Sequence, residues 1–311
     1  MLDAVSKAFF HGLARSRMLK HLASRYGMRR PSSFARRFIA GETIDEALEA
    51  ARAIQAGGLL ITLDQLGESV TGPEDASQAT RTYLTVIDRI VAAGVERNIS
   101  VKLTQLGLDI DRATCVDNLR RILDAAGRHE FFVRIDMENS PYVETTLDIF
   151  ETLWGQGYRH AGVVLQSALF RSEADTDRVN RLGARVRLVK GAYKEPRTVA
   201  YQRKAEVDAA FMRIARKLMT GGVYPAIATH DARLIDATKR LAAELDVAKT
   251  TFEFQMLYGI RRDLQARLVA DGYLFRVYVP FGDEWFPYFM RRLGERPANV
   301  GFVLKGVLGE R

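Results

Sequence analysis

The feature that most constrains the fold is an alternation of short β-rich runs with longer amphipathic stretches, repeated eight times along the chain. Successive runs begin roughly 24 to 40 residues apart, which is typical of consecutive strand–helix units. Eight such units predict a (β/α)8 barrel of the TIM type, and a doubly wound open sheet is the alternative. The expected strands are residues 59–64, 99–104, 131–136, 161–166, 186–191, 224–230, 250–255 and 274–280.

The alternation also predicts the domain organisation. No Pro-, Gly- or Ser-rich linker interrupts it, so residues 57–311 are expected to form one barrel. Residues 1–56 are expected to form a helical arm, whose last helix closes on Gly57 and Gly58. No apolar run reaches the roughly 18 residues of a membrane-spanning helix, so we do not expect the chain to cross a bilayer.

The net charge of +8 lies in the first 40 residues, which hold nine Lys and Arg but a single acid, Asp3. The rest of the chain has 37 basic and 37 acidic residues, so no nucleic-acid partner is expected. A basic arm packed on the body and touching an anionic membrane surface is predicted, with a transit peptide as the alternative. The expected location is the cytoplasm, with peripheral attachment to a membrane. The single cysteine, Cys115, excludes an internal disulfide.

The candidate site residues follow from one property of these barrels, which carry their chemistry at the C-terminal ends of the strands. His129 and His160 precede their strands and fail this criterion. Rossmann, P-loop and H-E-x-x-H motifs are absent from the sequence, and no metal site is expected. The polar residues at or near strand ends are Asp64, Glu68, Lys102, Asp136, Gln166, Arg187, Lys190, Thr229, His230, Glu253 and Tyr278.

Several of these residues allow more than one chemistry. Lys102 suits a Schiff-base amine, a partner for a substrate carboxylate, or a buried counter-ion to an acid such as Asp136. Asp136 suits a metal ligand, a general base or a hydrogen-bond anchor. Arg187 and Lys190 bring two cations to one strand end, where they suit a phosphate or a ring that becomes anionic on reduction. Gly191 lets the backbone approach such a ligand closely.

The last predicted helix combines aromatic and charged residues on one face. Trp285, Tyr288, Arg291, Arg292 and Glu295 recur at helical spacing, and the opposite side is apolar. A solvated polar stripe is one interpretation. The other is a carboxylate trap, because paired guanidinium groups grip a planar anion. With Leu257 and Tyr278 as apolar walls, the trap would suit a small ring that bears a carboxylate.

The motifs "RVYVPFGDEWFPYFMRRLGE", "VRLVKGAYKE", "VVLQ", "RIDME" and "IATHD" together resemble the proline dehydrogenase family of FAD-dependent barrels, over about residues 57 to 305. The resemblance implies oxidation of L-proline to Δ1-pyrroline-5-carboxylate with reduction of FAD. The roles that it implies are as follows: Arg291, Arg292 and Lys102 bind the carboxylate; Tyr278, Tyr288 and Leu257 wall the ring; Glu295 pairs with an arginine of the trap; Arg187, Gln166 and Met137 contact the flavin; Lys190, Gly191, Ala192, Thr229 and His230 hold the rest of FAD; and Asp136 orders the catalytic centre.

The resemblance also implies partners. Electrons would pass to a membrane quinone, and the product to a separate pyrroline-5-carboxylate dehydrogenase, as for a monofunctional bacterial enzyme. Glu68 is a candidate bridge to Arg291 or Arg292 while proline is absent. The rival hypotheses are a Schiff-base aldolase that uses Lys102 or Lys190, and a basic binding module without catalytic activity.

Overall fold

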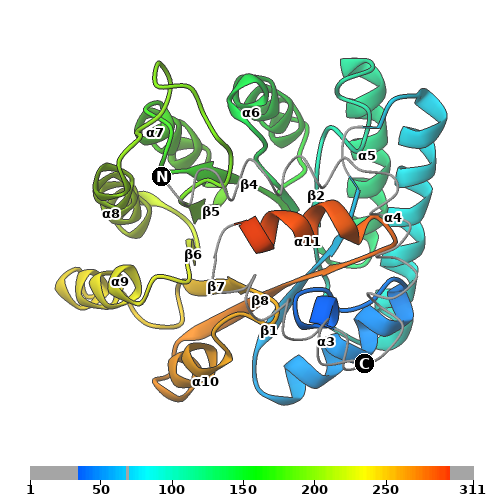
Figure 1. Ribbon diagram of the computed structural model, residues 1–311. Helices are drawn as coiled ribbons and strands as arrows, with labels where there is room; N and C mark the ends of the chain where they lie inside the picture. The colour runs from blue at the N-terminus through cyan, green and yellow to red at the C-terminus, as the bar shows by residue number, and fades with distance from the viewer. Residues whose placement is uncertain (1–33, 68–69, 295–311) are drawn as a thin grey trace.

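The computed structural model describes residues 34–67 and 70–294, and within them eight parallel strands close into a barrel in chain order (Figure 1). The predicted (β/α)8 fold is therefore confirmed, and the open sheet is excluded. The strands are buried on both faces, as parallel strands under a layer of helices must be. They are β1 (Leu60–Gln65), β2 (Asn98–Val101), β3 (Phe132–Ile135), β4 (Ala161–Gln166), β5 (Arg185–Val189), β6 (Ala226–Ala228), β7 (Glu253–Leu257) and β8 (Leu274–Phe281).

Helices connect successive strands and form the outer layer of the barrel (Figure 1). Asp111 caps one of them by accepting a hydrogen bond from the backbone of Thr114, and Gly94 ends another in the left-handed conformation. These helices are α4 (Pro73–Ala93), α5 (Arg112–Arg128), α6 (Ser140–Gly155), α7 (Ser172–Leu182), α8 (Lys204–Gly221), α9 (Ala232–Glu244) and α10 (Arg262–Ala270).

The helix that follows β8 does not join the outer layer. Figure 1 shows this helix, α11 (Trp285–Gly294), in front of the ring of strands. Its apolar side chains pack with the short 3-10 helix η1 (Phe34–Arg37) and with Leu66, which follows β1, in a cluster separate from the barrel core. The last helix, which follows β8, thus lies over the mouth of the barrel.

A helix that precedes the barrel packs at the seam between β1 and β8. This helix, α3 (Ile44–Ala56), contacts both strands, and Ala47, Leu48 and Ala51 belong to the main core. Thr43 and Glu46 form a capping box at its N-terminus. Although α3 shares the barrel core, the division of the chain at residue 56 stays a prediction, and residues 1–33 of the predicted arm lie outside the described residues.

Some predicted strand boundaries were wrong by up to three residues. Strand β7 begins at Glu253 instead of residue 250, because residues 248–251 form a turn in which the Thr251 amide donates to the Ala248 carbonyl, 3.0 Å away. Strand β2 ends at Val101, so Lys102 lies just past the strand. Strand β6 is confined to three residues, Ala226–Ala228. These shifts decide which side chains lie at the C-terminal end of the barrel.

The interior of the barrel contains charged side chains where barrels of this type usually hold branched apolar residues. Arg134, Arg187, Glu253 and Arg276 are each at most 6% exposed. Gly162 makes room for one of them, because a Cβ there would lie 2.8 Å from a terminal nitrogen of Arg134 and 2.5 Å from the Arg185 carbonyl oxygen. Within residues 34–67 and 70–294, no helix is long and apolar enough to span a membrane.

Candidate active site

Four of the predicted site residues form one hydrogen-bonded cluster at the C-terminal end of the barrel. Asp136 is its centre, and its two carboxylate oxygens accept hydrogen bonds from Arg187 and from the Tyr278 hydroxyl, both at 2.7 Å. The Lys102 ammonium lies 3.7 Å from the Asp136 carboxylate and 3.5 Å from the Tyr278 oxygen. These residues come from or directly follow β2, β3, β5 and β8, so only closure of the barrel brings them together.

The direct partner of Lys102 is Asp64, on β1. Its carboxylate oxygen lies 2.8 Å from Lys102 Nζ, closer than that of Asp136. Asp64 is fully buried, and burial raises the pKa of its carboxyl group, with Lys102 opposing the shift and Asp136 adding to it. Of the three alternatives for Lys102, the counter-ion is therefore observed, with Asp64 as the closer acid.

The Arg187 guanidinium group is held on three sides. Besides Asp136, it donates from Nε to Gln255 at 2.6 Å and from a terminal nitrogen to Ser100 at 3.2 Å. Its central carbon lies 5.2 Å from the centre of the Tyr278 ring. Burial and the charge of Asp136 keep the pKa of Tyr278 well above its ordinary value, so its hydroxyl remains a hydrogen-bond donor at neutral pH.

Lys190 lies at the end of β5 within an alternating cluster of four charges. Its ammonium is 2.6 Å from Asp208 and 3.1 Å from Asp231, and Lys204 pairs with the same two acids. Thr229 accepts a hydrogen bond from the Asp231 backbone at 3.2 Å and so belongs to the same corner. In this structure the Lys190 ammonium pairs with Asp208 and Asp231. Its contact with a phosphate therefore stays a prediction.

Replacing Asp231 with asparagine is expected to lower the free energy of unfolding at pH 7 by about 1.5 kcal/mol, a typical contribution of a hydrogen bond to a charged group. Burial opposes ionisation of Asp231, but the hydrogen bonds from Lys204 and Lys190 outweigh it and lower its pKa below the ordinary 3.8. The stabilisation is therefore present above pH 4 and is lost as the pH falls further. Urea unfolding at pH 7, 5 and 3.5 measures it.

Asparagine retains the hydrogen bond by which Asp231 caps α9, from the Arg233 amide at 3.1 Å, so the change isolates the charge. Asp88 is exposed on α4, and Asp88→Asn is the matched control with no expected effect. A gap between wild type and Asp231→Asn that stays constant down to pH 3.5 would contradict the assignment.

Two of the residues predicted to surround a cofactor, Gly191 and Gln166, form a narrow cradle where β5 and β4 end. Gly191 has a φ of +108°, and a Cβ there would lie 3.0 Å from the Gln166 side-chain oxygen. Gln166 donates from its amide to the Glu138 carbonyl at 2.8 Å, which orients its oxygen. Ala192 is exposed beside Gly191, and Met137 is buried. A larger residue at position 191 would be strained and would fill the cradle.

His230 has a structural contact that positions a predicted wall of the site. Its ring nitrogen Nε2 accepts a hydrogen bond from the Leu257 amide at 3.0 Å, and so it is the neutral acceptor at this atom. Leu257 pairs with Tyr278 across β7 and β8, so these two predicted walls are neighbours. Whether His230 also contacts a cofactor stays a prediction.

The trap residues lie on α11. Arg291 and Arg292 are half-buried, and the Arg292 guanidinium lies 5.2 Å from the centre of the Tyr288 ring. The solvated polar stripe, one of the two interpretations of this helix face, was wrong for Trp285, which is 1% exposed and donates from its indole nitrogen to Glu42 at 2.8 Å. Trp285 is buried because η1, the residues that follow it and Leu66 pack against α11. Glu295 and Glu68 lie outside the described residues.

Two contacts of the cluster were missed at the sequence level. Gln255 and Ser100 hold Arg187, yet neither was singled out, because a lone amide or hydroxyl in a strand carries little signal. Glu253 was wrongly placed among the residues at strand ends. Since β7 begins at Glu253, this side chain lies deeper in the barrel interior than the site at the strand ends. There it pairs with Arg276 at 2.8 Å.

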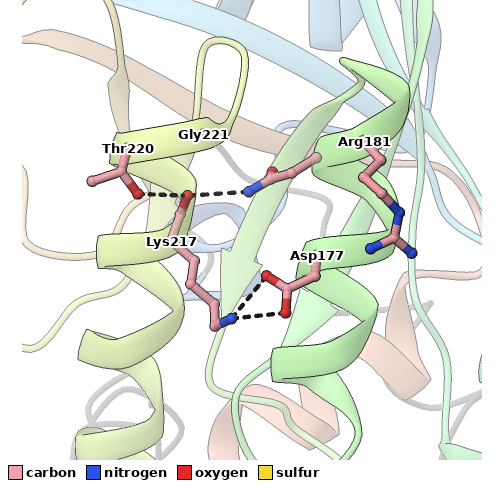
Figure 2. Close-up of a pocket in the computed structure, with 6 residues that line it drawn as sticks. Asp177, Arg181, Lys217, Thr220 and Gly221 are labelled. Carbon is pink, nitrogen blue, oxygen red and sulfur yellow. Dashed lines mark hydrogen bonds and ion pairs between the residues drawn. The ribbon is translucent and has the colours of Figure 1, made fainter.

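A separate surface hollow lies between α7 and α8, in the outer layer of helices (Figure 2). Figure 2 shows Lys217 and Asp177 facing each other across it, with their charged atoms 2.8 Å apart. Asn180 donates to the Lys217 carbonyl at 3.1 Å. The hollow contains none of the predicted site residues, so it is not part of the candidate active site.

Comparisons with known proteins agree with the geometry. The family model described as proline dehydrogenase matches residues 47–305. The chain is 42% identical over 303 residues to proline dehydrogenase 2 of Bacillus subtilis (strain 168), with 97% of this chain and 99% of that protein covered. It is 42% identical over 280 residues to the proline dehydrogenase of Deinococcus radiodurans, with 89% of this chain and 90% of that protein covered.

Among solved structures, the fold is similar to a crystal structure of proline utilization A (PutA) from Bdellovibrio bacteriovorus inactivated by N-propargylglycine. The TM-score is 0.79 and the sequence identity is 27%, over 89% of this chain and 34% of that one. The chain thus spans about a third of that larger protein.

Proposed function

The chain belongs to the proline dehydrogenase family, and from that premise we propose that it oxidises L-proline to Δ1-pyrroline-5-carboxylate by hydride transfer to a bound FAD. Membership supports proline dehydrogenase activity, the first step of proline breakdown. The cluster of Asp136 with Arg187, Tyr278 and Lys102 is the observation that carries the proposal, because it places fixed charges of both signs where several strands end.

The donors near the mouth fit a flavin nucleotide. Gly191 leaves space that a Cβ would fill beside Gln166, which is what a flat ring or a phosphate approaching the backbone needs. FAD, when bound, would supply the acceptor for the hydride. Gln166 and Met137 would flank its ring, and Lys190, Gly191, Ala192, Thr229 and His230 would hold its other parts. Engagement with phosphate would require Lys190 to exchange one of its acid partners.

Arg291, Arg292 and Lys102 would bind the proline carboxylate, and Tyr278, Tyr288 and Leu257 would enclose the ring. Binding the carboxylate at one end of a rigid ring fixes the opposite carbon in space. Orientation of this kind can account for about 7 to 11 kcal/mol of an activation barrier. Lys102 is well suited because Asp64 holds its ammonium at 2.8 Å and limits its motion.

Asp136 and Arg187 would stabilise the charges that develop during hydride transfer. Hydride departure leaves positive charge on the substrate carbon and nitrogen, and the Asp136 carboxylate, fixed by its two donors, would stabilise it. Arg187 would stabilise the negative charge that develops on the acceptor. Because three partners already hold its guanidinium, little reorganisation is needed during the reaction.

The ion pairs disfavour the aldolase hypothesis. A Schiff-base lysine must be neutral to attack a carbonyl, whereas Lys102 and Lys190 each lie beside a carboxylate at 2.8 Å or less. The basic binding module stays a hypothesis, since most of the basic residues that motivate it lie outside the described part of the chain.

Purified protein is expected to be yellow, and its flavin absorption should bleach when L-proline is added without oxygen. D-Proline is the control, because the same carboxylate contacts would direct its ring hydrogen away from the acceptor.

We further propose that the electrons pass to quinone and the product to a separate dehydrogenase. Adding a soluble quinone to the bleached enzyme should restore the yellow colour. A colourless protein, or one that L-proline does not bleach, would contradict the proposal.

A further inference from the structure

A continuous chain of buried polar side chains runs down the barrel interior from Arg187. Arg187 Nε donates to the Gln255 side-chain oxygen at 2.6 Å, and the Gln255 amide nitrogen donates to a carboxylate oxygen of Glu253. Glu253 in turn accepts from two nitrogens of Arg276, at 2.8 and 3.0 Å. Each of these four residues is at most 6% exposed, so water does not compete for the bonds.

The lower end of this chain is firmly fixed. Arg276 also donates to Glu96 at 2.5 Å and to the Ile61 carbonyl at 2.6 Å. Burial opposes ionisation of Glu253, but Arg276 outweighs it, and the pKa of Glu253 falls below its ordinary value. Glu253 is therefore a charged acceptor, held in place by a buried arginine.

The charges at both ends determine how Gln255 is oriented. A guanidinium group can only donate, so it must face the amide oxygen, whereas the Glu253 carboxylate can only accept and must face the amide nitrogen. A flipped amide would break both bonds. Gln255 thus transmits a fixed position from Glu253 to Arg187 without adding a negative charge beside the guanidinium.

We propose that Gln255 is a positioning residue that holds the Arg187 guanidinium in the orientation needed to stabilise charge on the reduced flavin, an inference that rests on the proposed function for its link to the cofactor. Asp136 and Ser100 bind the two terminal nitrogens, and Gln255 binds Nε, so that all three nitrogens are fixed. Without Gln255, a buried Nε–H lacks an acceptor, and the guanidinium can rotate away.

The test compares Gln255→Met, which keeps the volume, with Gln255→Glu, which keeps the acceptor but adds charge. Gln265 on α10 is also buried, at 6% exposed, and donates to the Ile260 carbonyl, so Gln265→Met is the matched control. In flavin-free protein, the Arg187 Nε–H signal in NMR, assigned by its loss in Arg187→Lys, should exchange with solvent at least tenfold faster in Gln255→Met than in wild type or the control.

In flavin-loaded protein, Gln255→Met should shift the equilibrium towards oxidised flavin about tenfold, which is about 30 mV for a two-electron couple. Gln255→Glu should shift it at least as far in the same direction, even if Gln255→Met folds poorly. The kcat should fall about tenfold while KM for L-proline changes less than twofold.

The inference is overturned if both variants keep the Nε–H exchange rate and the flavin potential of the wild type and lose only thermal stability. Gln255 would then merely fill space. A wild-type protein without flavin would contradict the proposed function, and the exchange measurement would still decide the positioning role.

Discussion

Replacing Arg291 and Arg292 together with methionine is expected to lower kcat/KM for L-proline by about 10²- to 10⁴-fold, mostly through a higher KM. Each charged hydrogen-bonding group contributes roughly 1.5 to 3 kcal/mol to binding of a carboxylate, and two neighbouring guanidinium groups act on the same anion. The loss concerns binding of a group that does not react. Steady-state rates with L-proline, and the Kd of the unreactive analogue L-tetrahydrofuroic acid, measure the effect.

The contribution of the carboxylate to recognition can be measured separately from that of the ring by using a second substrate. Pyrrolidine lacks the carboxylate, so wild-type enzyme should prefer L-proline by a large factor, and the double variant should lose most of that preference without reacting less with pyrrolidine. Arg121→Met, at an exposed position on α5, is the matched control with unchanged kinetics. An unaltered affinity of the double variant for L-tetrahydrofuroic acid would refute the carboxylate trap.

Asp136→Asn is expected to show the opposite kinetic pattern, with kcat reduced about 10²- to 10³-fold and KM nearly unchanged. Removing one preorganised group that stabilises charge typically costs about 2.7 to 4 kcal/mol of transition-state stabilisation. Here the loss leaves Arg187 without its charged partner. It also removes the negative charge that we propose stabilises the positive charge on the substrate. The rate of flavin bleaching in a single anaerobic turnover reports the chemical step directly.

Tyr278→Phe separates the two roles of Asp136, because it removes one donor at 2.7 Å and leaves the carboxylate charge and Arg187 in place. We expect a smaller loss, of about 10-fold, consistent with the lower end of the range for one hydrogen bond to a charged group. If Asp136→Asn bleaches as fast as wild type, Asp136 has only a structural role. Circular dichroism and thermal unfolding of each variant show whether the barrel has folded.

Much of the site was predictable because the barrel assigns a place to each strand end. Lys102, Asp136, Arg187 and Tyr278 come from or directly follow four different strands, and the rule that strand ends carry the chemistry was enough to group them. The direct contact between Lys102 and Asp64 was not predictable, since an alternation of strands places both residues at the mouth without giving the distance between them.

Other features depended on details that the sequence pattern does not contain. A shift of three residues in the start of β7 moved Glu253 from the mouth to the layer below and placed Gln255 against Arg187. Trp285 was expected on a polar stripe because helical periodicity distinguishes two faces only when one side of the helix meets solvent. Packing by η1 removes that condition for α11.

The order of residues along the chain determined the eight strand–helix units, the closed barrel and the family to which the chain belongs, because periodicity and short motifs are local properties. The tertiary structure alone decided which charges meet. Asp64 lies beside Lys102, and Gln255 reaches Arg187. Such contacts join residues far apart in sequence, and their distances depend on strand register and side-chain packing, which are fixed only when the barrel closes.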